Sequence, residues 1–460
     1  MLRLLIPFLL AALAAAPALA DTLVLDADRC VELALENNLA IAAARARLDE
    51  AAYGKRAAFG SFLPQVSATG TYTRLAKASE LTMYSAHDSI MTVPVFDPEG
   101  NYIGQTGVPV RVPVGMDSFS LKLSNENNYA VTGTVQQTLF TWGKLVNAYR
   151  IAGLSAEIQD AALAAARADV KVQAVQAFHS ALLARKTAVL MAESRDQLTR
   201  HVARVQALYD NGLAARLDLL RATVGLTNLR AQLAQVENGA ALATAALRMV
   251  IGVDDGRAIA LADSLEADTT TVDLDAALDR ALRQRPELTQ LRKATRIAEL
   301  GVRIARTANL PSAFVQANAS YKNPVGFSAE WGPDWNATAG VSWPIFTGGA
   351  NLAKLKAARS RERQAQIALA QVEDAVRLDV RAQAASVQAE AQNVGYQTEN
   401  VGVAQTALEL AETRYANGLL TNLEYLDTQL ALMQARLTRI NSLANYQVAR
   451  ARLDRATGEE

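Results

Sequence analysis

The sequence predicts a mainly α-helical protein that also carries four β-strands and is built as a tandem duplication. Two long tracts, 114–285 and 345–460, contain no proline and are rich in Ala, Leu, Gln, Arg and Glu, which favour helices. Related segments recur at fixed distances along the chain. Four short runs between the helical tracts alternate polar and apolar side chains, as strands do.

The duplication is clearest in two segments that lie 206 residues apart. "LYDNGLAARLDLLR" at 208–221 and "RYANGLLTNLEYLD" at 414–427 share Tyr, Asn, Gly and three Leu at matching positions. "FTWG" at 140–143 and "FTGG" at 346–349 keep this offset, whereas Pro64 and Pro311 are 247 residues apart. The first copy therefore carries an insertion of 41 residues. Because solenoid repeats span about 20–50 residues, we expect two large equivalent halves instead.

Each half is expected to form a long helical hairpin. Apolar residues recur every seven positions in the second half, which indicates a left-handed coiled coil. They are Val380, Val387, Val394, Val401, Leu408 and Tyr415. A less regular seam is expected in the first half, at Val175, Leu182, Val189, Val202, Val205 and Tyr209. Each long arm ends at an Asn-Gly pair and spans roughly 100 Å at about 1.5 Å per residue. Shorter helices are expected at 30–62 and 286–310.

The four expected strands occupy 65–74, 128–139, 312–322 and 336–345. Their lengths are close to that of a tilted strand that crosses a bilayer, although a half-buried sheet of a soluble domain shows the same alternation. Four strands leave two open edges, which a membrane does not tolerate unless sister chains close them. Aromatic residues near the strand ends fit an interfacial girdle. They are Tyr72, Tyr129, Phe140, Trp142, Tyr321, Trp331, Trp335, Trp343 and Phe346.

The first twenty residues, "MLRLLIPFLLAALAAAPALA", predict a secretory signal peptide that is cleaved before Asp21, with an N-terminal membrane anchor as the alternative. No later uncharged apolar run reaches the length of a transmembrane helix. Cys30 is the only cysteine, so no intrachain disulfide can form, and Asp28 and Arg29 before it do not resemble a lipid-attachment context. We expect Cys30 to be a small buried residue.

Composition and motifs also argue against several classes of function. The formal net charge is zero and no basic cluster stands out, so nucleic acid is not an expected partner. His87, His179 and His201 lie in unrelated segments, without metal-ligand spacing or a nucleophile and base arrangement. We therefore expect neither an enzyme nor a cofactor or metal site.

Several repeated motifs carry a family resemblance across essentially the whole mature chain. They are Leu-Pro at 63–64 and 310–311, "FTWG" and "FTGG", "RPEL" at 285–288, and the paired Asn-Gly-Leu turns. With these motifs the chain resembles the outer-membrane efflux protein family, the TolC-like channels. The resemblance implies a homotrimer in which each chain gives four strands to one 12-stranded β-barrel in outer-membrane lipid. A coiled-coil helical tunnel would continue it into the periplasm, belted by a small mixed equatorial domain.

The resemblance also implies a function and partners. The expected protein is the passive outer-membrane exit channel of a tripartite efflux or type I secretion system in a Gram-negative bacterium. It would dock to a periplasmic adaptor (membrane fusion) protein and to an inner-membrane pump of the RND or ABC type, and would be gated at its periplasmic helix tips. The transported substrate does not follow from the sequence, because a passive conduit takes its specificity from its pump.

The expected domain boundaries follow the duplication. The signal peptide covers 1–20, and the first repeat covers 21–250, with strands at about 64–75 and 128–140, an extracellular loop at 77–127 and a helical hairpin at 143–250 whose tip is 211–213. The equatorial region takes 251–285 together with 21–38. The second repeat covers 286–460, with strands at about 311–322 and 336–346 and a hairpin at 349–460 whose tip is 417–419.

Candidate site residues cluster after the two Asn-Gly pairs. By resemblance, Glu424 and Asp427 would form an acidic constriction that favours cations, and Tyr415 and Asp218 match a pair that latches the entrance. The arginine of that latch is replaced by Leu420 here, so the details of the gate are open. Thr421 and Glu424 also read as a helix-capping box, which leaves a purely structural role open for Glu424. Adaptor docking is expected at the tips, at Gly212, Leu213, Gly418 and Leu419.

Two other classes of protein fit parts of the pattern. A trimeric coiled-coil surface protein anchored by a barrel should group its strands at one end of the chain, whereas here two strand pairs lie inside two helical halves. A soluble helical scaffold without a barrel predicts no outer-membrane fractionation and no heat-modifiable oligomer. Both alternatives explain the sequence less fully than a channel does.

Overall fold

The computed structural model describes residues 23–105, 110–254, 257–262, 265, 272–326 and 328–459, so the expected signal peptide lies outside the described residues. The chain divides into two compact units. One unit combines Met1–Lys55, Arg150–Val302 and Lys356–Glu460 and is helical, and the other combines Arg56–Tyr149 and Arg303–Leu355 and contains the main sheet.

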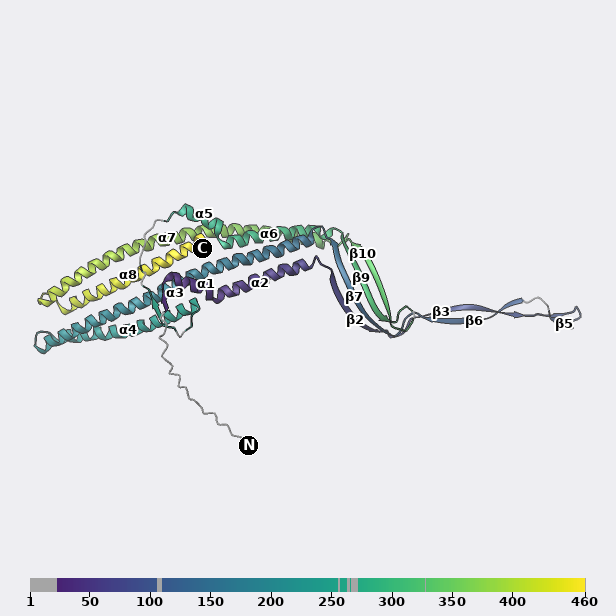
Figure 1. Ribbon diagram of the computed structural model, residues 1–460, viewed down its shortest axis with the longest axis horizontal. Coiled ribbons are helices and arrows are strands. Elements are labelled where there is room, and N and C mark those ends of the chain that lie inside the picture. Colours follow the sequence, from purple (N-terminus) through teal and green to yellow (C-terminus); the bar gives the residue numbers. More distant parts are fainter. Residues whose placement is uncertain are drawn as a thin grey trace, which may run out of the picture. The chain divides into compact units, whose positions relative to one another are not determined.

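Two long helical hairpins dominate the first unit (Figure 1). In the first hairpin α3 (Lys144–Asp210) is followed by α4 (Arg216–Ile251), and in the second α7 (Ala350–Ala416) is followed by α8 (Asn422–Thr457). The long arms have 67 residues each and the returning arms 36 each. The shorter helices are α1 (Ala27–Asn37), α2 (Leu39–Gly60), α5 (Leu274–Gln284) and α6 (Pro286–Arg306). Within the described residues, none of the helices has both the length and the apolar character needed to span a bilayer.

The expected heptad seam of the second hairpin is confirmed. Val380, Val387, Val394 and Leu408 are buried, and Val401 is half-buried. Val387 and Val394 pack with Leu443 and Tyr446 of α8, and Leu408 packs with Leu432 nearer the turn. The seven-residue repeat therefore locates the helix face that meets the returning arm.

The expected seam of α3 is wrong in its middle part. Val189 is 53% exposed, and Met191, Ser194, Leu198 and His201 are buried instead, in line with Val205, an expected seam position that is fully buried. These five are spaced three and four residues apart, which is the spacing of a coiled-coil seam. The sequence pattern missed the first four of these positions because two of them, Ser194 and His201, are polar.

A small region that combines strands and helices lies in the same unit as the hairpins. β1 (Leu23–Leu25) pairs in parallel with β8 (Ile259–Leu261), although 236 residues separate Leu23 from Ile259. Leu25 and Cys30 are fully buried in a cluster with Phe178 and Ile251, so the expectation of a buried Cys30 is confirmed. Burial raises the pKa of the Cys30 thiol to about 12.

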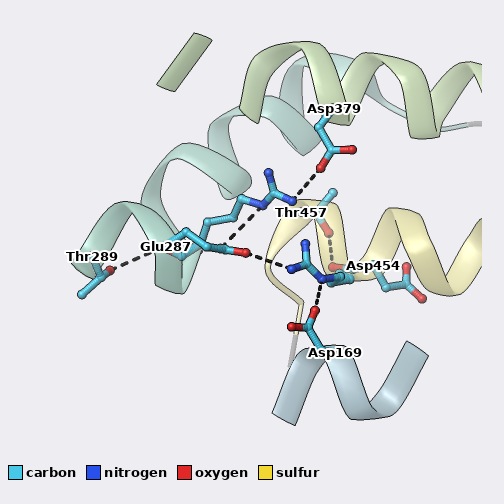
Figure 2. A network of polar contacts seen from close by, with 8 residues as sticks. Asp169, Glu287, Thr289, Asp379, Asp454 and Thr457 are labelled. Carbon is cyan, nitrogen blue, oxygen red and sulfur yellow. Dashed lines mark hydrogen bonds and ion pairs between the residues drawn. The ribbon is translucent and has the colours of Figure 1, made fainter. Parts of the chain in front are cut away.

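An ion-pair network joins four helices around the "RPEL" segment (Figure 2). Arg285, which is only 5% exposed, donates to Asp379 of α7 at 2.6 Å. Arg455 of α8 donates to Glu287 of α6 at 3.0 Å and also pairs with Asp169 of α3. The Arg455–Asp169 pair joins the two hairpins, and removing Asp379 would leave the buried Arg285 guanidinium without its close partner.

The second unit contains a four-stranded antiparallel sheet. Its strands are β2 (Gln65–Arg74), β7 (Asn127–Phe140), β9 (Ser312–Asn323) and β10 (Gly332–Ser342), in the order β10-β9-β7-β2. The central pair, β7 with β9, joins the two halves of the sequence. Among the strands that the structure describes, β2 and β10 are the edges of this sheet, so each carries a row of backbone groups without a strand partner.

The two faces of this sheet differ in chemistry. Exposed apolar and aromatic side chains share one face across all four strands, by the register of the pairing. They are Val66, Tyr72, Tyr129, Val131, Val135, Tyr321, Trp335 and Val341. The other face carries polar side chains, and Asn318 accepts from Thr134 at 2.9 Å and donates to Asn336 at 2.9 Å. An exposed apolar face opposite a hydrogen-bonded polar face is the reverse of a water-soluble sheet packed on a core.

Two details differ from the expected strands. β10 begins at Gly332 and ends at Ser342, earlier than the expected 336–345, and Pro344 cannot donate a ladder hydrogen bond beyond that end. The expected loop 77–127 contains regular structure: β3 (Glu80–Met91) pairs with β6 (Val110–Lys122), and β4 (Pro94–Phe96) pairs with β5 (Tyr102–Gln105).

Candidate functional site

The two hairpin turns have the same backbone geometry. Gly212 and Gly418 adopt φ of 72° and 71°, in the left-handed region that glycine enters without steric cost. Leu213 N–H donates to Leu208 C=O at 2.8 Å, and Leu419 N–H donates to Arg414 C=O at 2.9 Å. This six-residue closure is a Schellman motif, which explains why each turn contains Asn-Gly followed by an apolar residue.

Each turn exposes a leucine at its tip. Leu213 and Leu419 are both 76% exposed, and they lie next to the glycines that reverse the chain. When a partner covers an exposed apolar side chain at a helix tip, removing that side chain from water contributes favourable free energy. The four tip residues expected to dock an adaptor therefore form two matching, uncovered apolar points.

The turn of the second hairpin leads into a complete capping box. The Glu424 carboxylate accepts from Thr421 N–H at 2.9 Å and from the Thr421 hydroxyl at 2.7 Å, while Glu424 N–H donates back to the Thr421 hydroxyl. The Thr421 N–H and hydroxyl hold the pKa of Glu424 below its usual value. The carboxylate is thus both a helix cap and an exposed charge.

The other two acids occupy different positions. Asp427 is exposed on α8, beyond the capping box. Asp218 lies in the first turn of α4, and its backbone carbonyl accepts from the Asn422 side-chain amide at 3.2 Å. The two hairpin tips are therefore linked to each other through α4 and α8.

An aromatic and polar cluster fills the junction between the tips. His201 of α3 stacks on Tyr425 of α8 with ring centres 4.5 Å apart, and Tyr415 of α7 stacks on Tyr425 at 5.2 Å. His201 Nε2 lies 2.7 Å from the Asn422 side-chain oxygen. Because Asn422 donates its amide N–H to Asp218, its oxygen is the acceptor, and Nε2 of His201 carries the proton.

Burial sets the protonation of this cluster. Burial lowers the pKa of His201, an effect that the Asn422 hydrogen bond opposes and the nearby Arg204 charge reinforces. Burial also raises the pKa of Tyr415, and the Asp218 carboxylate raises it further. At neutral pH the histidine is therefore neutral and the tyrosine hydroxyl keeps its proton.

The structure thus brings Tyr415 and Asp218 together with three residues that the sequence analysis did not select. They are His201, an isolated histidine in the sequence, and Asn422 and Tyr425, which belong to no sequence motif beyond the turn. The spacing of His201 from Leu198 and Val205 could have placed it in the seam. Leu420 packs with Leu408, Ala411, Tyr425 and Leu432, so a cluster of apolar contacts occupies the position of the family arginine.

The surface of the two hairpin tips carries both charged and apolar side chains. Within the described residues, no group of three or more His, Cys, Asp or Glu side chains is arranged to hold a metal ion. The exposed groups at and beside the turns include the Glu424 and Asp427 carboxylates, the Arg216 and Arg414 guanidinium groups, and the side chains of Leu213 and Leu419.

Comparison with known proteins agrees with this architecture. The profile of the family described as outer membrane efflux protein matches residues 30–253 and 277–459. The chain therefore belongs to the outer membrane efflux protein family, whose members are TolC-like channels of the outer membrane.

Individual relatives are distant in sequence. The chain is 25% identical over 340 residues to the outer membrane efflux protein BepC of Brucella suis, covering 73% of that protein. It is 25% identical over 287 residues to the probable outer membrane lipoprotein SilC of Salmonella typhimurium, and this match spans 62% of either chain. The crystal structure of CusC has the same fold, with a TM-score of 0.74 at 20% identity, and the match covers 94% of this chain and 92% of CusC.

Proposed function

We propose that this chain is one subunit of a homotrimeric exit channel that conducts solutes from the periplasm across the outer membrane. The observation that carries the proposal is the four-stranded sheet with one exposed apolar face, one polar face and two unpaired edges. In hydrocarbon every backbone group must find a partner, so the edges of β2 and β10 require strands from other chains. The apolar face then meets lipid and the polar face lines the interior.

The strand number supports three chains rather than two. Two four-stranded sheets would close an eight-stranded barrel, whose interior is filled by its own side chains. Three sheets give twelve strands and a wider lumen. The two hairpins, with long arms of 67 residues each, would form the periplasmic tunnel as two equivalent products of a tandem duplication.

We place the gate of the channel at the helix tips. Glu424, Asp427, Asp218 and Tyr415 lie at or next to the two turns. The capping role of Glu424 does not compete with a pore role, because the Thr421 contacts keep the carboxylate ionised while it stays exposed. Three copies of Glu424 and Asp427 around one axis would favour cations.

The proposed partners follow from the same tips. Gly212, Leu213, Gly418 and Leu419 present two matching apolar points to a periplasmic adaptor, which would connect the channel to an inner-membrane pump. SilC is named a lipoprotein, but Cys30 of this chain lies fully buried inside α1. We infer that Cys30 does not carry a lipid.

Ion selectivity in planar bilayers tests the acidic gate. Glutamine is accepted in a capping box, so Glu424→Gln removes the charge and keeps the helix cap. We expect Glu424→Gln with Asp427→Asn to lower the preference for cations over anions, and each single variant to lower it partly. Thr428→Ala, which removes only a hydroxyl bonded to its own helix backbone, is the matched control. Unchanged selectivity in the double variant would remove both acids from the gate.

A further inference from the structure

The contact between His201 and Asn422 joins the two hairpins at the point where the proposed channel would have to open. His201 belongs to the long arm of the first hairpin, and Asn422 is the first residue of the returning arm of the second. Both side chains are almost fully buried, with exposed fractions of 4% and 6%. The 2.7 Å hydrogen bond between them is therefore not exchanged readily for bonds to water.

Asn422 connects three helices through one side chain. Its oxygen accepts from His201 of α3, and its amide nitrogen donates to the backbone carbonyl of Asp218 in α4. Moving α8 away from the first hairpin breaks both bonds together. Gln197 lies on α3 one helical turn before His201. Its side-chain oxygen accepts from the Gln429 side-chain amide of α8 at 3.5 Å, so a second polar contact follows the first along the same junction.

Aromatic stacking holds the imidazole in place. Tyr425 stacks on one side of the His201 ring, and the Tyr415 ring is tilted against it with centres 5.4 Å apart. Tyr415 comes from α7, so three rings from three helices meet at the junction. Leu420 cannot form a polar bond here, which leaves His201 and Asn422 as a buried polar link between the tips.

We propose that His201 and Asn422 form a clasp that keeps the two helix tips together and the conduit closed, and that acidification releases this clasp. The inference rests on the proposed channel function and adds to it a proton-controlled closing residue. His201 is a positioning residue in this account, because it acts on the opening through the helices that it joins.

The burial of His201 and the charges around it together set the direction in which its pKa shifts, and hence the direction of the pH response. The ionisable groups that face it are Arg204 on its own helix, Tyr415 on α7, Tyr425 on α8 and Asp218 on α4, with Arg200 and Glu412 close to Tyr425. A second proton would go to Nδ1, in a buried site beside Arg204. The tyrosine ring faces would attract an imidazolium, but burial, the largest effect, lowers the pKa of His201 from its ordinary 6.5.

The link between proton binding by His201 and the closed arrangement gives the pH range over which the clasp weakens. A released His201 is hydrated and takes up a proton more readily than a clasped one. The closed arrangement is therefore fully supported above pH 6.5 and loses stability as the pH falls below 6.5, through the lowered pKa of the clasped histidine. The proposal thus predicts a channel that opens on acidification.

Single-channel recording of the full-length protein in planar bilayers tests the clasp, at about pH 7.5 and about pH 5.5, on either side of the ordinary histidine pKa. We expect the wild-type channel to be mostly closed at the higher pH and to open at the lower. His201→Phe keeps an aromatic ring without a donor, and Asn422→Ala removes the acceptor. His201→Phe should raise the open-to-closed ratio at the higher pH roughly tenfold, the effect of one lost buried hydrogen bond, and Asn422→Ala, which also loses the bond to Asp218, should raise it at least as much.

Three further variants separate the clasp from general damage. The His201→Phe and Asn422→Ala double variant should open no more than Asn422→Ala alone, because Asn422→Ala already breaks the contact that His201→Phe removes. His201→Gln retains an N–H donor but does not titrate, so it should stay closed at both pH values. His179→Phe replaces another buried histidine of α3 and should keep the wild-type pH response.

The outcomes are distinguishable. Recordings in which His201→Phe and Asn422→Ala match the wild type at both pH values overturn the clasp, as does an acid response that persists in His201→Gln. A protein that conducts no ions in any variant instead refutes the channel assignment itself. If His201→Phe does not assemble, Asn422→Ala and His201→Gln still decide the question.

Discussion

At the scale of single residues, the contact between Gly340 and Phe314 shows a position in the main sheet where only glycine fits. Gly340 of β10 pairs with Phe314 of β9, and a Cβ atom added at Gly340 would lie 2.7 Å from the Phe314 ring. The ring covers the glycine and shields the strand backbone, a pairing that stabilises glycines in sheets. The polar face of the sheet therefore contains one large apolar side chain only where a glycine makes room for it.

We expect Gly340→Val to lower the free energy of unfolding by about 1–3 kcal/mol, because the new side chain overlaps the Phe314 ring. Thermal unfolding of the purified protein measures the effect. Gly133→Ala is the control, since a Cβ there makes an ordinary contact at 3.8 Å. Phe314→Ala should restore part of the stability of Gly340→Val, and a lack of rescue would argue against the ring contact.

Cys30 shows how burial controls the chemistry of a single side chain. Burial raises its pKa to about 12 from 9.0, so the thiolate is scarce in the folded protein at neutral pH. We expect maleimide to label Cys30 only after denaturation. Because the folded state favours the thiol, this residue contributes stability below pH 9.0 that is lost as the pH rises toward 12. Rapid labelling of the native protein at neutral pH would contradict the buried position.

At the scale of elements, helix periodicity located the seam of one hairpin and misplaced part of the other. The α7 seam consists of valines and leucine, so its seven-residue repeat is visible in the sequence. On α3 the seam passes through Ser194 and His201, which are polar, while Val189 is apolar and exposed. Where buried seam positions are occupied by polar side chains, the positions of apolar residues alone therefore predict the wrong packing face of the helix.

Truncation distinguishes the two assignments of the α3 seam. Leu198 packs with Leu226 and Leu229 of α4. We expect Leu198→Ala to lower the free energy of unfolding by about 2–4 kcal/mol, and Val189→Ala by less than about 1 kcal/mol. Urea unfolding followed by circular dichroism measures both. An equal loss in the two variants would favour the seam through Val189.

Other elements could be predicted only in part. The alternation of polar and apolar residues located the four strands of the main sheet, and the Asn-Gly pairs marked both turns, because each signal is local. The family resemblance grouped 21–38 with 251–285, but no local signal predicted the pairing of β1 with β8, whose residues lie far apart in the chain. The ribbon of β3 with β6 contains Pro113 and little alternation, so it was not predicted. His201 was overlooked because its partner, Asn422, lies 221 residues away.

At the scale of the whole molecule, the proposed channel requires the open sheet edges to pair with strands of other chains. β2 and β10 lack strand partners on their outer sides within one chain, and the apolar face is exposed. Both features have one explanation if β2 of one chain pairs with β10 of the next around a threefold axis. The helical hairpins of the three chains would then enclose the conduit whose tips carry the gate.

Crosslinking of the two sheet edges tests this claim most directly. Ser67→Cys in β2 and Asn336→Cys in β10, with Cys30→Ser, place one thiol on each edge. Within one chain the edges are three strand spacings apart, about 14 Å, so a shorter bismaleimide can link them only between chains. Applied to outer membranes, it should yield covalent dimers and trimers and no larger species. Monomers alone, or a ladder that continues beyond trimers, would contradict the closed three-chain channel.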